Sequence, residues 1–147
     1  MSLAEWLKNG WLIEHETSRQ EISHLLNLVD RDLKDCRNAA LSYDWRFNIA
    51  YNAALQCAKA ALAASGFRSA KGSHHYRVIY SLEHTIGTDK KKIHKLDAFR
   101  KKRNASEYNH AGAVSATELE EMIAAARALR TSVEGWIRSE HPGLVAE

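Results

Sequence analysis

Apolar residues recur every three or four positions along most of this 147-residue chain, which is the spacing of one face of an α-helix. Such stripes predict one helix over residues 18–41 and another over residues 117–140, the second with heptad-like spacing. A serine or threonine with a glutamate three residues later fits a capping box, and one opens each helix: Ser18 with Glu21, and Thr117 with Glu120.

The segment from Ser42 to Ala64 differs, because its run from Ala50 to Ala64 is small and apolar nearly all round. Ser42 is suited to cap a helix there, and Ser65-Gly66 fits its C-terminal end. A helix without a polar face is expected at the centre of a protein, where alanine side chains let neighbouring helices approach closely.

Three further segments complete the expected elements. A short amphipathic opening covers residues 3–12, Ser73 begins a helix over 74–86, and a basic helix runs from Thr88 or Asp89 to about Asn109. Brief turns join these segments, so we expect an all-α, up-and-down bundle of four or five helices. No repeat or linker divides the chain, which predicts one domain over residues 1–147 with its core at 18–138.

Composition agrees with a folded helical protein. Hydrophobic residues make up 45% and charged residues 27%, and the chain has a single proline. Cys36 and Cys57 are too few for a disulfide framework, so a reducing cytoplasm is expected. The charged start does not fit a signal peptide, and no apolar run reaches membrane-spanning length, so we expect no membrane partner.

Positive charge is concentrated in the basic helix. Residues 90–103 hold eight Lys/Arg and one acid, whereas the rest of the chain holds 13 Lys/Arg and 17 Asp/Glu. This imbalance indicates an anionic partner such as RNA or a nucleotide, although a solvated helix face is a plain alternative. Candidate phosphate contacts are Lys95, Arg100, Lys102 and His74.

The inward face of the basic helix ends in an arginine. Ile93, Leu96 and Phe99 follow helical spacing, and Arg103 continues the same face one turn later. A buried guanidinium without partners costs several kcal/mol, on the order of 3–5, so Arg103 needs specific neighbours.

Polar residues that can act on a phosphodiester follow Arg103 within one or two turns. His110 can take the proton of a ribose 2′-hydroxyl, and Arg103 can bind the phosphate through two N–H groups. Asn104 can orient the phosphate or the histidine, and Tyr108 can donate a hydrogen bond or stack on a base. Such RNA cleavage needs neither a metal nor another cofactor.

Structural roles compete with each of these assignments. Arg103 can pair with Glu107 or with a carboxylate of another helix, and Tyr108 can pack in the core. His110 can serve only to cap the helix, since a cation near a helix C-terminus gains about 0.3–1 kcal/mol.

The motif resembles that of the HEPN family of helical ribonuclease and nucleotide-binding domains. Arg103, Asn104 and His110 are similar to the family's Arg-polar-x-His signature, here with the longer Arg-x6-His spacing. The alanine-rich run from Tyr51 to Arg68 resembles the family's second long helix, and Ser73-His74-His75 its polar entry into the next helix.

The resemblance implies a homodimer in which two motif helices face each other, with a composite cleft from Arg103 and His110 of both subunits. Many members are metal-independent ribonucleases, and several are toxins paired with a nucleotidyltransferase antitoxin. Others have lost activity and bind nucleotide, RNA or a partner protein. Tyr108 stands where many members carry the histidine, as in relatives of doubtful activity.

Two further hypotheses involve neither RNA cleavage nor the binding of nucleotide or RNA. Glu21-x-x-His24 and Glu107-x-x-His110 have the spacing of di-iron bundles, but inward carboxylates on the two other helices are lacking in the sequence pattern. A purely structural helical dimer, with Arg103 as an internal ion-pair partner, is the other reading. We expect Trp45 and Trp136 to lie in the core or at a dimer interface.

Overall fold

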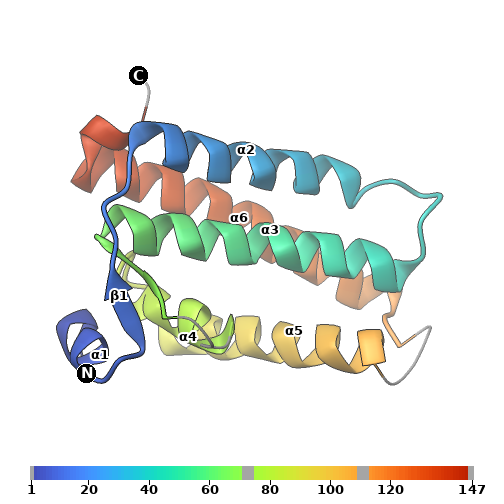
Figure 1. Cartoon of the computed structure of the whole chain (residues 1–147). Coiled ribbons are helices and arrows are strands. Elements are labelled where there is room, and N and C mark those ends of the chain that lie inside the picture. The colour runs from blue at the N-terminus through green and yellow to red at the C-terminus, as the bar shows by residue number, and fades with distance from the viewer. Residues whose placement is uncertain (1, 71–74, 109–112, 146–147) are drawn as a thin grey trace.

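The computed structural model of the chain describes residues 2–70, 75–108 and 113–145, with the backbone alone for 105–108. Four long helices lie side by side, α2 (Arg19–Asp35), α3 (Tyr43–Ala64), α5 (Lys90–Tyr108) and α6 (Ala116–Glu140) (Figure 1). Shorter elements are α1 (Leu3–Lys8), α4 (His75–Tyr80), and the 3-10 turns η1 (Ser81–Glu83) and η2 (Pro142–Leu144). The predicted all-α bundle is confirmed.

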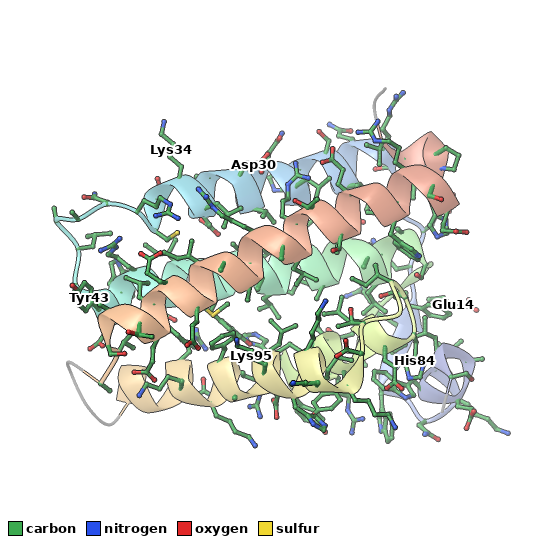
Figure 2. All side chains as sticks on the ribbon, turned by 180° about the vertical axis from the view of Figure 1, so that it is seen from behind. Glu14, Asp30, Lys34, Tyr43, His84 and Lys95 are labelled. Atoms are coloured by element: carbon green, nitrogen blue, oxygen red, sulfur yellow. The ribbon has the colours of Figure 1, made fainter. Side chains whose placement is uncertain are left out.

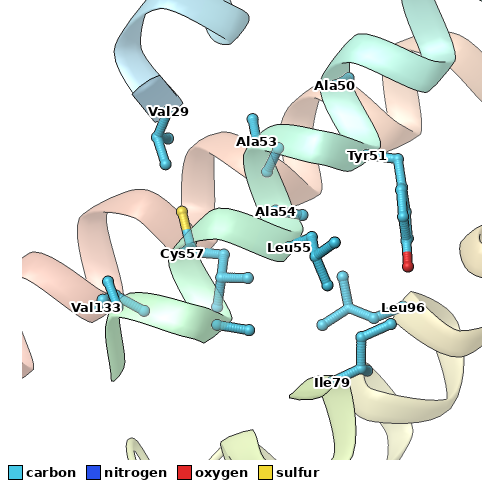
Figure 3. Close-up of a cluster of buried hydrophobic side chains, with 14 of the residues drawn as sticks. Val29, Ala50, Tyr51, Ala53, Ala54, Leu55, Cys57, Ile79, Leu96 and Val133 are labelled. Carbon is cyan, nitrogen blue, oxygen red and sulfur yellow. The ribbon is translucent and has the colours of Figure 1, made fainter. Parts of the chain in front are cut away.

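Helix α3 lies at the centre, as its composition predicted. It packs against α2, α6, α5 and α4, and thirteen of its side chains are buried, eight of them alanines. Small side chains permit this close approach on several sides at once. Figure 3 shows Val29 of α2, Val133 of α6 and Leu96 of α5 directed toward α3.

A polar contact fixes how α2 meets α3. Asp32 of α2 is 4% exposed, and its carboxylate accepts a hydrogen bond of 2.7 Å from Asn52 of α3. Arg31 pairs with the same carboxylate at 3.0 Å. Because a buried charge is tolerated only with such partners, this contact sets the register of the two helices.

A small two-stranded sheet was not predicted. Strand β1 (Leu12–Glu14) pairs antiparallel with β2 (Phe67–Ser69), and Ile13 lies opposite Arg68. The sheet brings α1 beside the end of α3, where Trp6, Leu12 and Leu62 form a second buried cluster. Strands of three residues are too short to show an alternating pattern, so periodicity along the chain could not predict them.

Several helix boundaries differ from the predicted ones. Helix α2 ends at Asp35 rather than near Leu41, because the chain turns at Asn38. The side-chain oxygen of Asn38 accepts a hydrogen bond from the N–H of Ala40, which stabilises this turn. Helix α4 gives way to the 3-10 turn η1 before the predicted end at residue 86. Ser73, His74 and residues 109–112 lie outside the described residues.

The two predicted capping boxes fared differently. Ser18 does cap α2, but Glu21 accepts hydrogen bonds from Thr17 and His15 instead of reaching back to Ser18. The box placed at Thr117 was wrong, because α6 begins two residues earlier. Ser115 accepts from the N–H of Glu118 at 3.1 Å, and Glu118 accepts from the N–H of Ser115 at 3.0 Å.

Figure 2 shows the bundle from behind, with Lys95 between α5 and α6. In both views α5 lies at the edge of the bundle, beyond α3 from α2. None of the helices in the described ranges combines the length and the apolar character needed to cross a bilayer.

Candidate functional site

The inward face of α5 positions Arg103. Ile93, Leu96 and Phe99 are buried, with exposures of 1%, 8% and 7%, as helical spacing predicted. Phe99 packs edge-on against Phe47 of α3, with ring centres 5.9 Å apart. One turn after Phe99, the side chain of Arg103 is therefore directed at α3 while remaining partly exposed.

Neutral amides hold the guanidinium of Arg103 in place. Its Nε donates to Oδ1 of Asn48 on α3 at 2.7 Å, and its Nη1 donates to Oδ1 of Asn104 at 3.3 Å. Asn48 and Asn104 thus fix the orientation of the guanidinium between α3 and α5.

Tyr51 places a phenol beside this guanidinium. The Cζ atom of Arg103 lies 5.7 Å from the centre of the Tyr51 ring, a cation–π distance. Tyr51 is 3% exposed, and its hydroxyl has no hydrogen-bond partner among the described residues. Figure 3 shows Tyr51 leaving α3 on the side of Leu96 and α5, with the hydroxyl at its tip.

Burial raises the pKa of Tyr51 to about 12, with the positive charges of Arg103 and Arg100 opposing that shift and Asp97 adding to it. The phenol is therefore protonated at neutral pH and can act only as a donor toward an anion. A buried hydroxyl without a partner costs about 1–3 kcal/mol, and that of Tyr51 is unsatisfied within the described residues.

Helix α4 adds a histidine to the same place. The ring of His75 lies 6.4 Å from that of Tyr51, tilted by 33°. The neighbouring His74, predicted from the sequence as a phosphate contact, lies outside the described residues. Asn48, Tyr51 and His75 are the members of the site that sequence reasoning missed.

The predicted catalytic residues divide into described and undescribed ones. Arg103 and Asn104 lie together as expected. His110 lies outside the described residues, and Tyr108 is described only as the last backbone position of α5. Their predicted roles stay predictions, and so do the pairing of Arg103 with Glu107 and the capping role of His110.

The predicted phosphate contacts on α5 face two directions. Arg100 lies one turn before Arg103 and donates to Asp97 at 2.7 Å. Lys102 pairs instead with Glu118 of α6 at 3.1 Å. Lys95 lies 5.9 Å from the Phe99 ring, on the groove of about 560 Å³ between α5 and α6. Of these three, Arg100 lies on the side of α4, with its guanidinium 5.8 Å from the centre of the Tyr76 ring.

The rival metal site gains no support from the described residues. Among them, no three His, Cys, Asp or Glu side chains are grouped so as to hold a metal ion. Glu21, one of the proposed ligands, is engaged by Thr17 and His15, and the hydrogen bond from Thr17 lowers its pKa despite partial burial, with His15 adding to the effect.

Two aromatic predictions can be placed. Trp136 is partly buried against the core and stacks edge-on with His141, at 5.0 Å between ring centres. Trp45 is 54% exposed, so its assignment to the core was wrong. Its alternative assignment, to a dimer interface, stays a prediction.

Comparison with known proteins gives one match. The model of the family described as HEPN domain matches residues 25–136, well over half of the chain. That range includes α3, α4 and α5 in full, and so the whole described site. Searches of curated proteins and of solved structures found no match.

Proposed function

Because the chain belongs to the HEPN domain family, which supports a nucleotide- or RNA-related role, we propose that it is a metal-independent endoribonuclease. The observation that carries the proposal is the cluster around Arg103. A partly exposed guanidinium is held by two neutral amides beside a protonated phenol whose hydroxyl has no partner within the described residues.

In this proposal the cluster binds the scissile phosphate. Arg103 contacts a non-bridging oxygen and stabilises the charge that builds up there in the transition state. The Tyr51 hydroxyl donates to the same phosphate, which satisfies its own buried donor. Asn48 and Asn104 keep the guanidinium in one orientation, so little reorganisation is needed during the reaction.

His110 acts as the general base. Its imidazole takes the proton of the ribose 2′-hydroxyl, the 2′-oxygen attacks phosphorus, and the bond to the 5′-oxygen breaks. An imidazolium returns a proton to that 5′-oxygen, so protons balance. The products are a 2′,3′-cyclic phosphate and a 5′-hydroxyl end. Tyr108 supports binding by stacking or by hydrogen bonding.

We also propose the domain extent, oligomeric state, location and partner of this protein. Residues 1–147 form a single HEPN-like domain with its core at 18–138, and two copies dimerise through the motif helix. The protein is cytoplasmic and acts as the toxin of a pair whose antitoxin is a small nucleotidyltransferase. The buried packing of Trp6 against Leu62 supports one body that includes the N-terminal segment.

Cleavage of RNA in the presence of EDTA tests the proposed activity. We expect the purified protein to produce 2′,3′-cyclic phosphate ends, and Arg103→Ala to reduce the rate by at least about 100-fold, since one transition-state donor is worth about that much. His110→Ala should remove the general base and abolish cleavage. Arg138→Ala is the matched control, because Arg138 lies on α6 in an exposed pair with Glu134.

A second function remains in view because Tyr108 takes the position of the usual histidine. In that case the same cluster binds nucleotide, RNA or a partner protein without turnover. Salt-sensitive RNA binding by a protein that shows no cleavage under any condition would favour this binding module over the nuclease.

A further inference from the structure

A second cluster of chemically distinctive side chains lies one turn before Arg103 along the bundle. Trp6 of α1, Tyr76 and Arg77 of α4, and Arg100 and Lys101 of α5 line an open hollow of about 440 Å³, together with Tyr80 and Asp97. We call this the aromatic hollow. Its volume falls in the usual range for small-molecule sites.

Aromatic faces and guanidinium groups alternate around the aromatic hollow. The rings of Tyr76 and Tyr80 meet edge-on at 6.3 Å, and Arg100 lies 5.8 Å from the centre of the Tyr76 ring. Arg77 lies 5.1 Å from the same ring and 3.6 Å from the ring of Trp11. Planar cations and aromatic rings together form a surface on which another flat ring can stack.

The aromatic hollow carries a net positive charge, and a carboxylate orients two of its cationic side chains. Three cationic side chains face one carboxylate, that of Asp97, which is 8% exposed. Asp97 accepts from Arg100 at 2.7 Å and pairs with Lys101 at 3.6 Å. The carboxylate therefore orients these cations. Because it is already engaged, it is poorly placed to read the hydrogen-bonding edge of a base.

Position along α5 links the hollow to the Arg103 cluster. Arg100 and Arg103 are three residues apart, so their side chains lie about one helical turn, or about 5 Å, apart along the axis. Tyr51 experiences the charges of both arginines. Successive nucleotides are separated by about 3.4 Å when stacked and by more when splayed. A strand with one phosphate at Arg103 therefore reaches the hollow with a neighbouring nucleotide.

We propose that the aromatic hollow is a subsite for one unpaired base of single-stranded RNA, next to the phosphate held at Arg103. The proposal rests on the proposed function, which makes RNA the ligand, but it concerns the binding of RNA and not its cleavage. The base stacks on Tyr76 while Arg77 and Arg100 attract the flanking phosphates. Bases inside a duplex have both faces covered, so the subsite selects single strands, with little preference among bases.

Fluorescence polarisation of a labelled ten-nucleotide RNA tests the subsite without any chemistry. All its riboses are 2′-O-methylated, which removes the attacking hydroxyl, and a blunt duplex of the same strand with its complement is the double-stranded probe. Tyr76→Ala should weaken binding of the single strand about tenfold and leave duplex binding unchanged, because one stacked base is lost. Tyr76→Phe should bind as the wild type does, because its ring can still stack.

Tyr43→Ala is the matched control, because this tyrosine is 46% exposed at the start of α3, away from the hollow. A set of probes with one abasic position each adds a test on the wild-type protein alone. One abasic position should cost about tenfold with the wild type and nothing further with Tyr76→Ala. Unchanged binding by Tyr76→Ala, or an equal loss for duplex and single strand, would overturn the subsite.

These outcomes separate the two proposals. Tyr76-dependent binding by a protein that never cleaves RNA would contradict the proposed nuclease activity and support the base subsite. EDTA-resistant cleavage that depends on Arg103, without any effect of Tyr76 on binding, would contradict the base subsite and support the nuclease activity. Preferential binding of an acidic peptide of equal charge over the RNA would show that the hollow serves a protein partner, which also overturns the subsite.

Discussion

At the scale of single residues, Tyr51 combines deep burial with a hydroxyl that has no partner in the described ranges. Removing that hydroxyl removes an unsatisfied donor, so Tyr51→Phe should be at least as stable as the wild type at pH 7. The same change should slow RNA cleavage about tenfold or more, because a donor to the phosphate is lost. Urea unfolding and cleavage rates measure the two effects on one variant.

The pKa of Tyr51 gives this variant a second signature. The unfolded chain releases the phenol proton near pH 10, whereas the folded protein holds it to about pH 12 because the ring is buried. The contribution to stability is therefore complete below pH 10 and is lost as pH rises from 10 to about 12, by on the order of 3 kcal/mol at most. Tyr51→Phe should lose less stability over that range. Parallel pH curves for the two proteins would contradict the assignment.

What the sequence could reveal at this scale was limited to one helix at a time. Helical spacing placed Arg103 on the inward face because Ile93 and Phe99 define that face within the same helix. Asn48 and Tyr51 come from a different helix, and spacing along α5 contains no information about which side chains of α3 it meets. The available signal was that both are polar residues on a largely apolar helix, since buried polar atoms need partners.

At the scale of elements, the N-terminus of α6 shows why local motifs are ambiguous. Two overlapping sequences fit a capping box, and the structure uses Ser115 with Glu118 instead of Thr117 with Glu120. The flanking residues distinguish them. Val114 and Leu119, before the cap and at the fourth helical position, are 4% and 2% exposed and belong to the same core cluster. This is the arrangement of a hydrophobic staple, which the Thr117 alternative lacks.

Capping energies test that assignment. Ser115→Ala should lower the free energy of unfolding by about 1 kcal/mol, because the N–H of Glu118 loses its acceptor at the helix start. Thr117→Ala, two residues later and exposed, should change it by less than about 0.5 kcal/mol. Chemical denaturation of the two variants under identical conditions measures both, and a larger loss for Thr117→Ala would restore the original prediction.

The C-terminal end of α2 shows that a helix boundary can depend on a residue from another helix. Its apolar stripe continues to Cys36, so periodicity alone extended the helix too far. The carbonyl of Cys36 accepts from Nε of Arg46 at 2.7 Å, and Asn38 turns the chain. A side chain from α3 thus satisfies the helix end, and such tertiary capping is not visible in the sequence of α2 itself.

At the scale of the whole molecule, the arrangement of helices was predictable because one segment is apolar all round and the others have one apolar face. That pattern requires α3 to be central and leaves α5, with its row of lysines and arginines, at the edge (Figure 1). The site therefore lies where a second copy or a polyanion can approach it. Nothing in one chain's periodicity states which surface would meet a second copy, so the proposed dimer rests on the family resemblance alone.

A composite cleft in a dimer makes the activity depend on both protomers. If each cleft needs Arg103 from two subunits, a heterodimer of wild type and Arg103→Ala is inactive. Adding a tenfold excess of Arg103→Ala to a fixed amount of wild type should then remove most of the RNA cleavage once subunits have exchanged, whereas the same mass of albumin should not. Light scattering should give about twice the monomer mass of 16.6 kDa for both proteins. Full activity in the mixture would show that each protomer works alone, because an inactive partner can poison only a site that it helps to build.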